Sequence, residues 1–102
     1  PQVLAQRRID HALTDLTFES RACSAQLLHP DGLGVQMNWD DACRWVQVHT
    51  ADRPEPQLNR SGLALEPMTC PPNAFQSGDG LIELAPGDSV TTQWRIGAIG
   101  PR

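Results

Sequence analysis

One carboxylate in this sequence stands out by its surroundings. Glu66 follows an apolar run at residues 63–65, precedes Pro67, and lies in a proline-rich segment that continues to Phe75. A glutamate at the end of an apolar strand points into a half-buried, poorly solvated place, where it can take or give a proton near neutrality. The segment therefore predicts a general base at Glu66.

A structural role for Glu66 is the alternative interpretation. Arg60 precedes it in the same part of the chain. In this interpretation Glu66 ends an ordinary strand and forms a salt bridge with Arg60. The ion pair then perturbs the pKa of the carboxylate without any role in catalysis. The spacing alone leaves both interpretations open.

The length and charge of the chain limit the class of protein. With 102 residues it forms at most one domain with a single modest core, and because it begins with Pro1 rather than methionine we expect a chain that is either processed or a piece of a longer protein. The net charge is −4, and no basic cluster extends beyond Arg7-Arg8, so nucleic acid is not an expected partner. No apolar stretch approaches the roughly 18 residues that span a bilayer, and no signal peptide is visible, so we expect a soluble protein with no membrane partner.

The cysteines indicate a reducing compartment. Cys23, Cys43 and Cys70 are odd in number and match no zinc-binding spacing, which argues against both a structural metal site and a secreted disulfide framework. We expect buried free thiols and a cytoplasmic protein, with no metal bound.

The hydrophobic pattern predicts an all-β chain. Helical periodicity is hard to find, whereas residues 22–29 and 33–39 flank a Pro-Asp-Gly turn and predict a hairpin. Residues 1–11 show no convincing strand. Short strands at about ten-residue intervals predict six or seven strands in an antiparallel β-sandwich. The further strands expected are 44–50, 63–66, 81–84 and 90–96, with loops at 51–61 and 67–80.

The strand expected at 44–50 has two different faces. Val46 and Val48 alternate with Trp45, Gln47 and His49, so the apolar valines point to one side and the mixed set to the other. The face that carries His49 is a conceivable pocket lining.

Several segments, in order, carry a resemblance to a known family. They are residues 9–16, 45–50 and 62–75, followed by 84–88 and Trp94-Arg95-Ile96. From about Ile9 to Ile99 the chain resembles the C-terminal third of the aldose 1-epimerases, which are galactose mutarotase-like proteins. The resemblance implies an antiparallel galactose mutarotase-like supersandwich, of which residues 1–102 form the C-terminal part of a single domain.

The resemblance implies an enzyme that interconverts the α and β anomers of free hexoses such as galactose or glucose. One group removes the proton of the C1 hydroxyl while another protonates the ring oxygen, and the ring opens to the aldehyde. Glu66 occupies the place of the family's glutamate base. Asp10 matches the aspartate that accepts hydrogen bonds from sugar hydroxyls. For Asp10 a structural role, turning the chain beside His11, stays open.

The family's acid, a histidine, lies upstream of the matched region. We expect His11 and His29 to be surface or structural residues, and neither they nor His49 fall in a segment that resembles the acid's site. The chain then holds half an active site, and the expected partner is a missing upstream segment, in a second chain or an uncleaved precursor. The reaction needs no metal or organic cofactor.

Trp39, Trp45 and Trp94 could stack on the apolar face of a sugar, but alternating inward positions favour a place in the core, above all for Trp94.

Three other functions remain as alternatives. One is a hexose-phosphate 1-epimerase, which requires an arginine cluster to bind phosphate, whereas the arginines are scattered. The others are a non-catalytic carbohydrate-binding or sensing module and an interaction sandwich without a ligand. The arginines concerned are Arg7, Arg8, Arg44 and Arg60.

Overall fold

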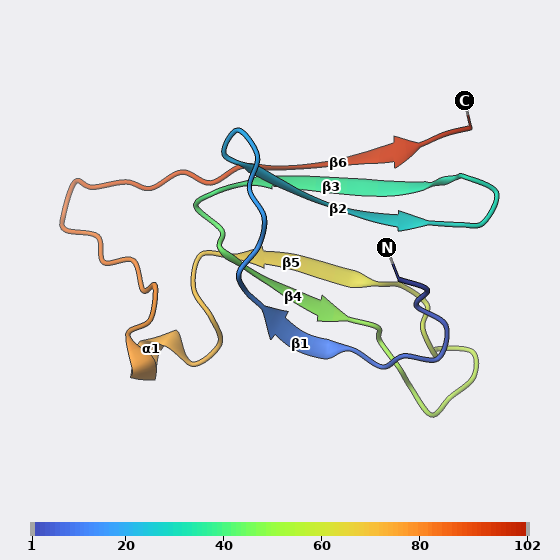
Figure 1. Ribbon diagram of the computed structural model, residues 1–102. Coiled ribbons are helices and arrows are strands. Elements are labelled where there is room, and N and C mark those ends of the chain that lie inside the picture. Colours follow the sequence, from blue (N-terminus) through green and yellow to red (C-terminus); the bar gives the residue numbers. More distant parts are fainter. Residues whose placement is uncertain (1, 102) are drawn as a thin grey trace.

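The computed structural model describes residues 2–101, which form two three-stranded antiparallel sheets, one above the other in Figure 1. One sheet has the strand order β1-β4-β5 and the other β2-β3-β6. The predicted predominance of antiparallel strands is confirmed, and the six strands match the lower of the two expected numbers. Their bounds are β1 Asp10–Leu13, β2 Ala22–Leu28, β3 Gly34–Asp40, β4 Trp45–His49, β5 Ala64–Met68 and β6 Trp94–Ile99.

The predicted hairpin is present as β2 and β3. Its turn is closed by hydrogen bonds from His29 N to Leu33 O (2.8 Å) and from Leu33 N to the Asp31 carboxylate (2.8 Å). Gly32 has a φ of 91°, a conformation that glycine adopts without steric cost. The turn therefore fixes the register of the two strands, which pair from Ala22–Asp40 to Leu28–Gly34.

Two strand predictions near the ends of the chain were wrong. Residues 10–13 form β1, although no strand was expected up to residue 11, because β4 offers its edge and pairs Asp10 with His49. Residues 81–84 do not form a strand. They lie in a long exposed connection that follows α1 (Ala74–Ser77), and no described strand runs beside them to complete a ladder (Figure 1).

The expected strands 63–66 and 90–96 are shifted in the structure. β5 runs one residue past Pro67, which an edge strand tolerates because the missing N–H faces away from the ladder. β6 begins only at Trp94. Just before it, the Asp40 carboxylate accepts a hydrogen bond from Gln93 N at 2.9 Å, which binds the chain to the end of β3.

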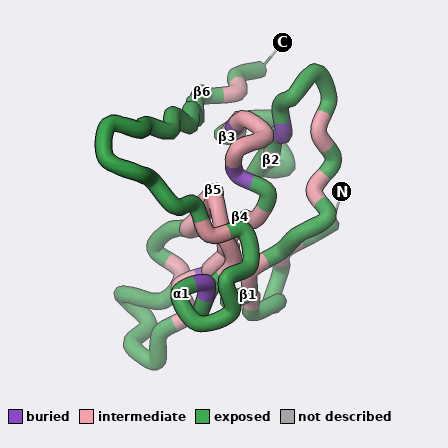
Figure 2. Tube along the Cα trace, turned by 90° about the vertical axis from the view of Figure 1, so that its left-hand side faces the viewer, coloured by how far each residue is buried: buried purple, intermediate pink, exposed green. Residues whose placement is uncertain are grey.

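The core is small and lies where the two sheets meet. Cys23 and Trp39 of one sheet pack with Val46 of the other and with Cys43 in the connection between β3 and β4, and few other positions are buried (Figure 2). Trp39 is 3% exposed, so its predicted place in the core is confirmed. Partly buried apolar residues surround this cluster: Leu16, Phe18, Ala25, Met37 and Leu65.

The prediction of a core position for Trp94 was wrong for the described chain, in which this residue is 63% exposed. Trp94 lies in β6 at the edge of its sheet, and no described segment covers it. The three cysteines are free thiols as predicted, but the expected burial holds only for Cys23 and Cys43, whereas Cys70 is partly exposed. Burial raises the pKa of Cys23. In the part of the chain that the structure describes, no helix has the length and apolar character needed to cross a membrane.

Candidate functional site

The two residues singled out from the sequence lie on one face of one sheet. Gln47 in β4 pairs with Glu66 in β5, and His49 pairs with Asp10 in β1. Residues directly opposite each other in neighbouring strands point to the same side of a sheet. Asp10 and Glu66 therefore flank Gln47 on a common face, with two strand spacings, about 10 Å, between β1 and β5.

This face points away from the other sheet. Val48 and Leu65 alternate with the polar residues and line the space between the two sheets. The side chains of Gln47 and Glu66 consequently face outward, where a ligand can reach them. We call this surface, made of Asp10, Trp45, Gln47, His49 and Glu66, the polar face.

Asp10 is held by the middle strand of the sheet. Gln47 Nε2 donates a hydrogen bond of 2.9 Å to Asp10 Oδ1, and His49 Nδ1 lies 3.6 Å from the same oxygen. The Asp10 side chain is still 69% exposed. An ionised carboxylate can accept further hydrogen bonds at both oxygens, so this arrangement suits the binding of vicinal hydroxyl groups.

The surroundings of Glu66 differ from both interpretations made from the sequence. The expected half-buried place is wrong, because Glu66 is exposed in β5. The alternative salt bridge is also absent, because Arg60 Nε donates to Asp52 at 2.9 Å instead. Within residues 2–101 no hydrogen bond or ion pair engages the Glu66 carboxylate.

The loop after β5 returns to the polar face at Trp45. Gly80 has a φ of 60°, and a Cβ atom at this position would lie 2.6 Å from the Trp45 ring. A glycine is therefore required for the loop to pack so closely on the indole. Trp45 is half-buried by this contact and stands two residues from Gln47 on the same side of β4.

The three histidines occupy different places. His49 lies on the polar face, as the alternation in β4 predicted, and its Nδ1 is buried without a hydrogen bond in the described chain. His29 lies in the β2–β3 turn with Nδ1 3.0 Å from Asp31, and His11 lies on β1 beside Asp10 but on the opposite face. The surface positions expected for His11 and His29 are confirmed by their exposure.

Sequence reasoning missed Gln47 as a site residue. The signal that could have found it was its place between Trp45 and His49 on one face of the strand. No set of three or more His, Cys, Asp or Glu side chains gathers for a metal ion anywhere in residues 2–101.

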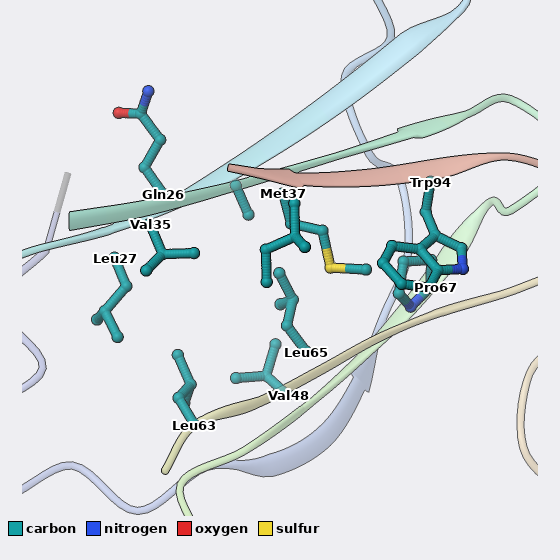
Figure 3. A pocket seen from close by; sticks show the side chains of 11 residues that line it. Gln26, Leu27, Val35, Met37, Val48, Leu63, Leu65, Pro67 and Trp94 are labelled. Atoms are coloured by element: carbon teal, nitrogen blue, oxygen red, sulfur yellow. The ribbon is translucent and has the colours of Figure 1, made fainter. Parts of the chain in front are cut away.

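A second surface lies between the two sheets. At one end the sheets close on the Trp39 cluster, and at the other an apolar cleft of about 840 Å³ between them is open to solvent. Figure 3 shows Leu27 and Val35 on one wall, with Val48 and Leu63 opposite. A well-packed sandwich has no void of this size. The cleft lining is Ala25, Gln26, Leu27, Val35, Met37, Val48, Leu63, Leu65, Pro67, Trp94 and Ile96.

Comparison with known proteins finds a bacterial relative. The chain is 39% identical over 87 residues to YihR of Escherichia coli strain K12, which is described as an uncharacterized protein. The match takes in 82% of this chain and 25% of the relative, so the chain spans about a quarter of that protein's length. No protein-family model and no solved structure matches the chain.

Proposed function

We propose that the protein is an aldose 1-epimerase that interconverts the α and β anomers of free hexoses such as galactose or glucose. The observation that supports this most directly is the placement of Asp10 and Glu66 on one exposed face, on either side of Gln47. One carboxylate is bound to a neighbouring side chain and the other is free. This division suits one group that binds the sugar and one that moves a proton.

In the proposed reaction Glu66 is the general base. It takes the proton of the C1 hydroxyl while a histidine protonates the ring oxygen, and the C1–O5 bond breaks to give the aldehyde. Rotation about C1–C2 and closure with the transfers reversed give the other anomer. Asp10 accepts hydrogen bonds from sugar hydroxyls and holds the ring in place. Both proton carriers are side chains, so we propose no metal or organic cofactor.

The acid histidine is proposed to lie outside this chain, in an upstream segment of the same fold. Two observations support such a segment. The E. coli relative is about four times as long as the region matched, and the cleft between the sheets leaves apolar side chains uncovered. The complete fold is proposed to be a galactose mutarotase-like supersandwich, with residues 1–102 as the C-terminal part of one domain.

The phosphorylated-hexose alternative is weaker. Arg60 already donates to Asp52 and to backbone carbonyls, and the Arg44 guanidinium lies 5.6 Å from the Phe18 ring centroid. Neither is available as part of an arginine cluster that could bind phosphate. The non-catalytic carbohydrate-binding module uses the same polar face and differs only in lacking the acid.

The charge of the chain and its free thiols bear on its other partners and on its location. With a net charge of −4 we propose neither nucleic acid nor a membrane as a partner. The three free thiols support a cytoplasmic location.

The deciding experiment is polarimetric mutarotation of freshly dissolved α-D-galactose and α-D-glucose by the full-length protein. Glu66→Gln should lower turnover by at least about a hundredfold, the usual contribution of a positioned base. Glu83→Gln, in the exposed connection before β6, is the matched control and should retain activity. No acceleration by the unmodified protein, together with sugar binding in a titration, would favour the binding module.

A further inference from the structure

The backbone just before Asp10 is bound to the end of β4 by Thr50. This residue is 3% exposed; its N–H donates to Ile9 O at 2.9 Å, and its hydroxyl oxygen accepts from Ile9 N at 3.1 Å. The hydroxyl has a single proton and two acceptors within reach, Asp52 Oδ1 and, at 3.2 Å, Ile9 O. Ile9 O already accepts from the Thr50 N–H, so we assign the hydroxyl proton to Asp52. The Thr50 side chain thus extends the β1–β4 ladder by one residue and links it to Asp52.

Asp52 continues this chain of contacts to Arg60. Its second oxygen accepts a hydrogen bond of 2.9 Å from Arg60 Nε, and the two side chains are only 19% and 25% exposed. Hydrogen bonds from the Thr50 hydroxyl and then from Arg60 hold the pKa of Asp52 below its usual value. The carboxylate is therefore ionised at neutral pH and bound on both oxygens.

Arg60 uses all three of its side-chain nitrogens. Besides Nε on Asp52, one terminal nitrogen donates to Ala5 O and the other to Arg7 O, in the segment that leads into β1. Only the planar guanidinium fork can reach a carboxylate and two carbonyls at once. The positive φ of Arg60 (52°) and of Ala51 (56°) shows that the loop adopts an uncommon backbone conformation to place this fork.

We infer that Thr50, Asp52 and Arg60 form a clamp that positions Asp10 for sugar binding, an inference that rests on the proposed function. The clamp residues do not lie on the polar face and are positioning residues rather than sugar contacts. β1 is an edge strand of four residues and Asp10 is its first residue, so the strand itself gives Asp10 little support. The clamp provides this support by holding the backbone of Ile9, the residue just before Asp10.

The test is made in the full-length protein with Arg60→Lys, which keeps the charge but loses the fork. We expect the KM for galactose to rise about tenfold with kcat within about twofold, as for a lost charged hydrogen bond. In an Asp10→Asn background the same change should leave KM unaltered, because its effect passes through Asp10. Equal effects of Arg60→Lys in both backgrounds would overturn the clamp as a positioning device.

A second readout does not depend on activity. The side-chain amide of Gln47 donates to Asp10, so its NMR signals report the position of that carboxylate. We expect Arg60→Lys and Asp52→Asn each to shift these signals in the direction seen in Asp10→Asn. Arg53→Lys is the matched control, since Arg53 Nη1 donates to the Asp52 backbone carbonyl and not to its carboxylate, and it should shift nothing.

The two readouts separate the clamp from the proposed reaction. Absence of mutarotation by the unmodified protein would reject the epimerase, and the Gln47 signals would then decide the clamp alone. Gln47 signals unchanged in both folded variants would reject the clamp even if the protein is an active epimerase.

Discussion

Gln47 Nε2 lies 2.9 Å from Asp10 Oδ1, and this hydrogen bond ties the edge strand β1 to the middle strand of its sheet. The same glutamine is the register partner of Glu66 in β5. One amide side chain thus stands between two carboxylates and is bonded to one of them. Its oxygen remains free to accept a hydrogen bond from a ligand that lies across the sheet.

Replacing Gln47 by Met should loosen Asp10 without altering the base. The thioether has a similar length but no donor, so Asp10 loses a hydrogen bond and its orientation. We expect the KM for galactose to rise about fivefold and kcat to change less, measured by mutarotation of the full-length protein. Gln26→Met, on the other sheet, is the control, and an unchanged KM in Gln47→Met would remove Gln47 from the site.

Asp10→Asn tests the sugar-binding role directly. The amide keeps the size of the side chain but can accept hydrogen bonds at only one atom, so KM should rise about tenfold or more while kcat falls less. Titration with sugar gives the affinity independently. Asp15→Asn, an exposed aspartate after β1, should leave KM unchanged. If Asp10→Asn instead lowers the melting temperature and leaves KM as it was, Asp10 has the structural role.

The clamp gives the folded protein an acid-sensitive component. The pKa of Asp52 is lowered in the fold, first by the Thr50 hydroxyl and then by Arg60, relative to about 3.9 when unfolded. Its stabilising contribution is therefore fully present above pH 4 and is lost as the pH falls through the folded pKa. Asp52→Asn should melt below the unmodified protein at pH 7, and the gap should close toward about pH 2.

A thermal melt series between pH 7 and pH 2 checks this expectation. Asp79→Asn is the control, because Asp79 forms no ion pair in the described chain. A gap between Asp52→Asn and the unmodified protein that stays constant over this range would show that Asp52 does not act through its charge.

The sequence predicted which face of a strand a side chain lies on better than it predicted which strands pair. Alternation in β4 was enough to place Gln47 and His49 on one side, and the apolar run before Glu66 was enough to place a strand there. The meeting of Asp10 with Gln47 could not be predicted, because Asp10–Leu13 has weak strand propensity and becomes a strand only by pairing with β4.

The errors in burial have a different physical origin. Trp94 alternates like a core residue yet is 63% exposed, and residues 82–84, which were expected in a strand, are exposed as well. Local pattern indicates which side chains are suited to burial, whereas burial itself depends on which segments pack against them, and no described segment packs over Trp94. The apolar run before Glu66 likewise predicted a strand, but it could not show that the carboxylate would be exposed.

The contact between Gly80 and Trp45 gives a test of the loop over the polar face. Gly80→Ala places a Cβ within 2.6 Å of the indole at a φ of 60°, so the loop must shift away from Trp45. We expect a loss of about 1–2 kcal/mol of stability and a change in near-ultraviolet circular dichroism. Gly78→Ala has a similar φ but open space, and it should lose stability without the spectral change. Equal spectra for the two variants would argue against the contact.

The apolar cleft should make residues 1–102 bind a hydrophobic dye when they are produced alone. The cleft has exposed side chains on one wall, Trp94 and Ile96, and the partly exposed Leu65 on the other. Apolar surfaces of this kind bind anilinonaphthalene sulfonate. The full-length protein should bind little dye, because the proposed upstream segment covers the cleft. Ile96→Glu should reduce dye binding by the short chain and destabilise the full-length protein, whereas Val90→Glu, outside the cleft, should do neither. Strong dye binding by the folded full-length protein would mean that the cleft stays open and that the upstream segment packs elsewhere.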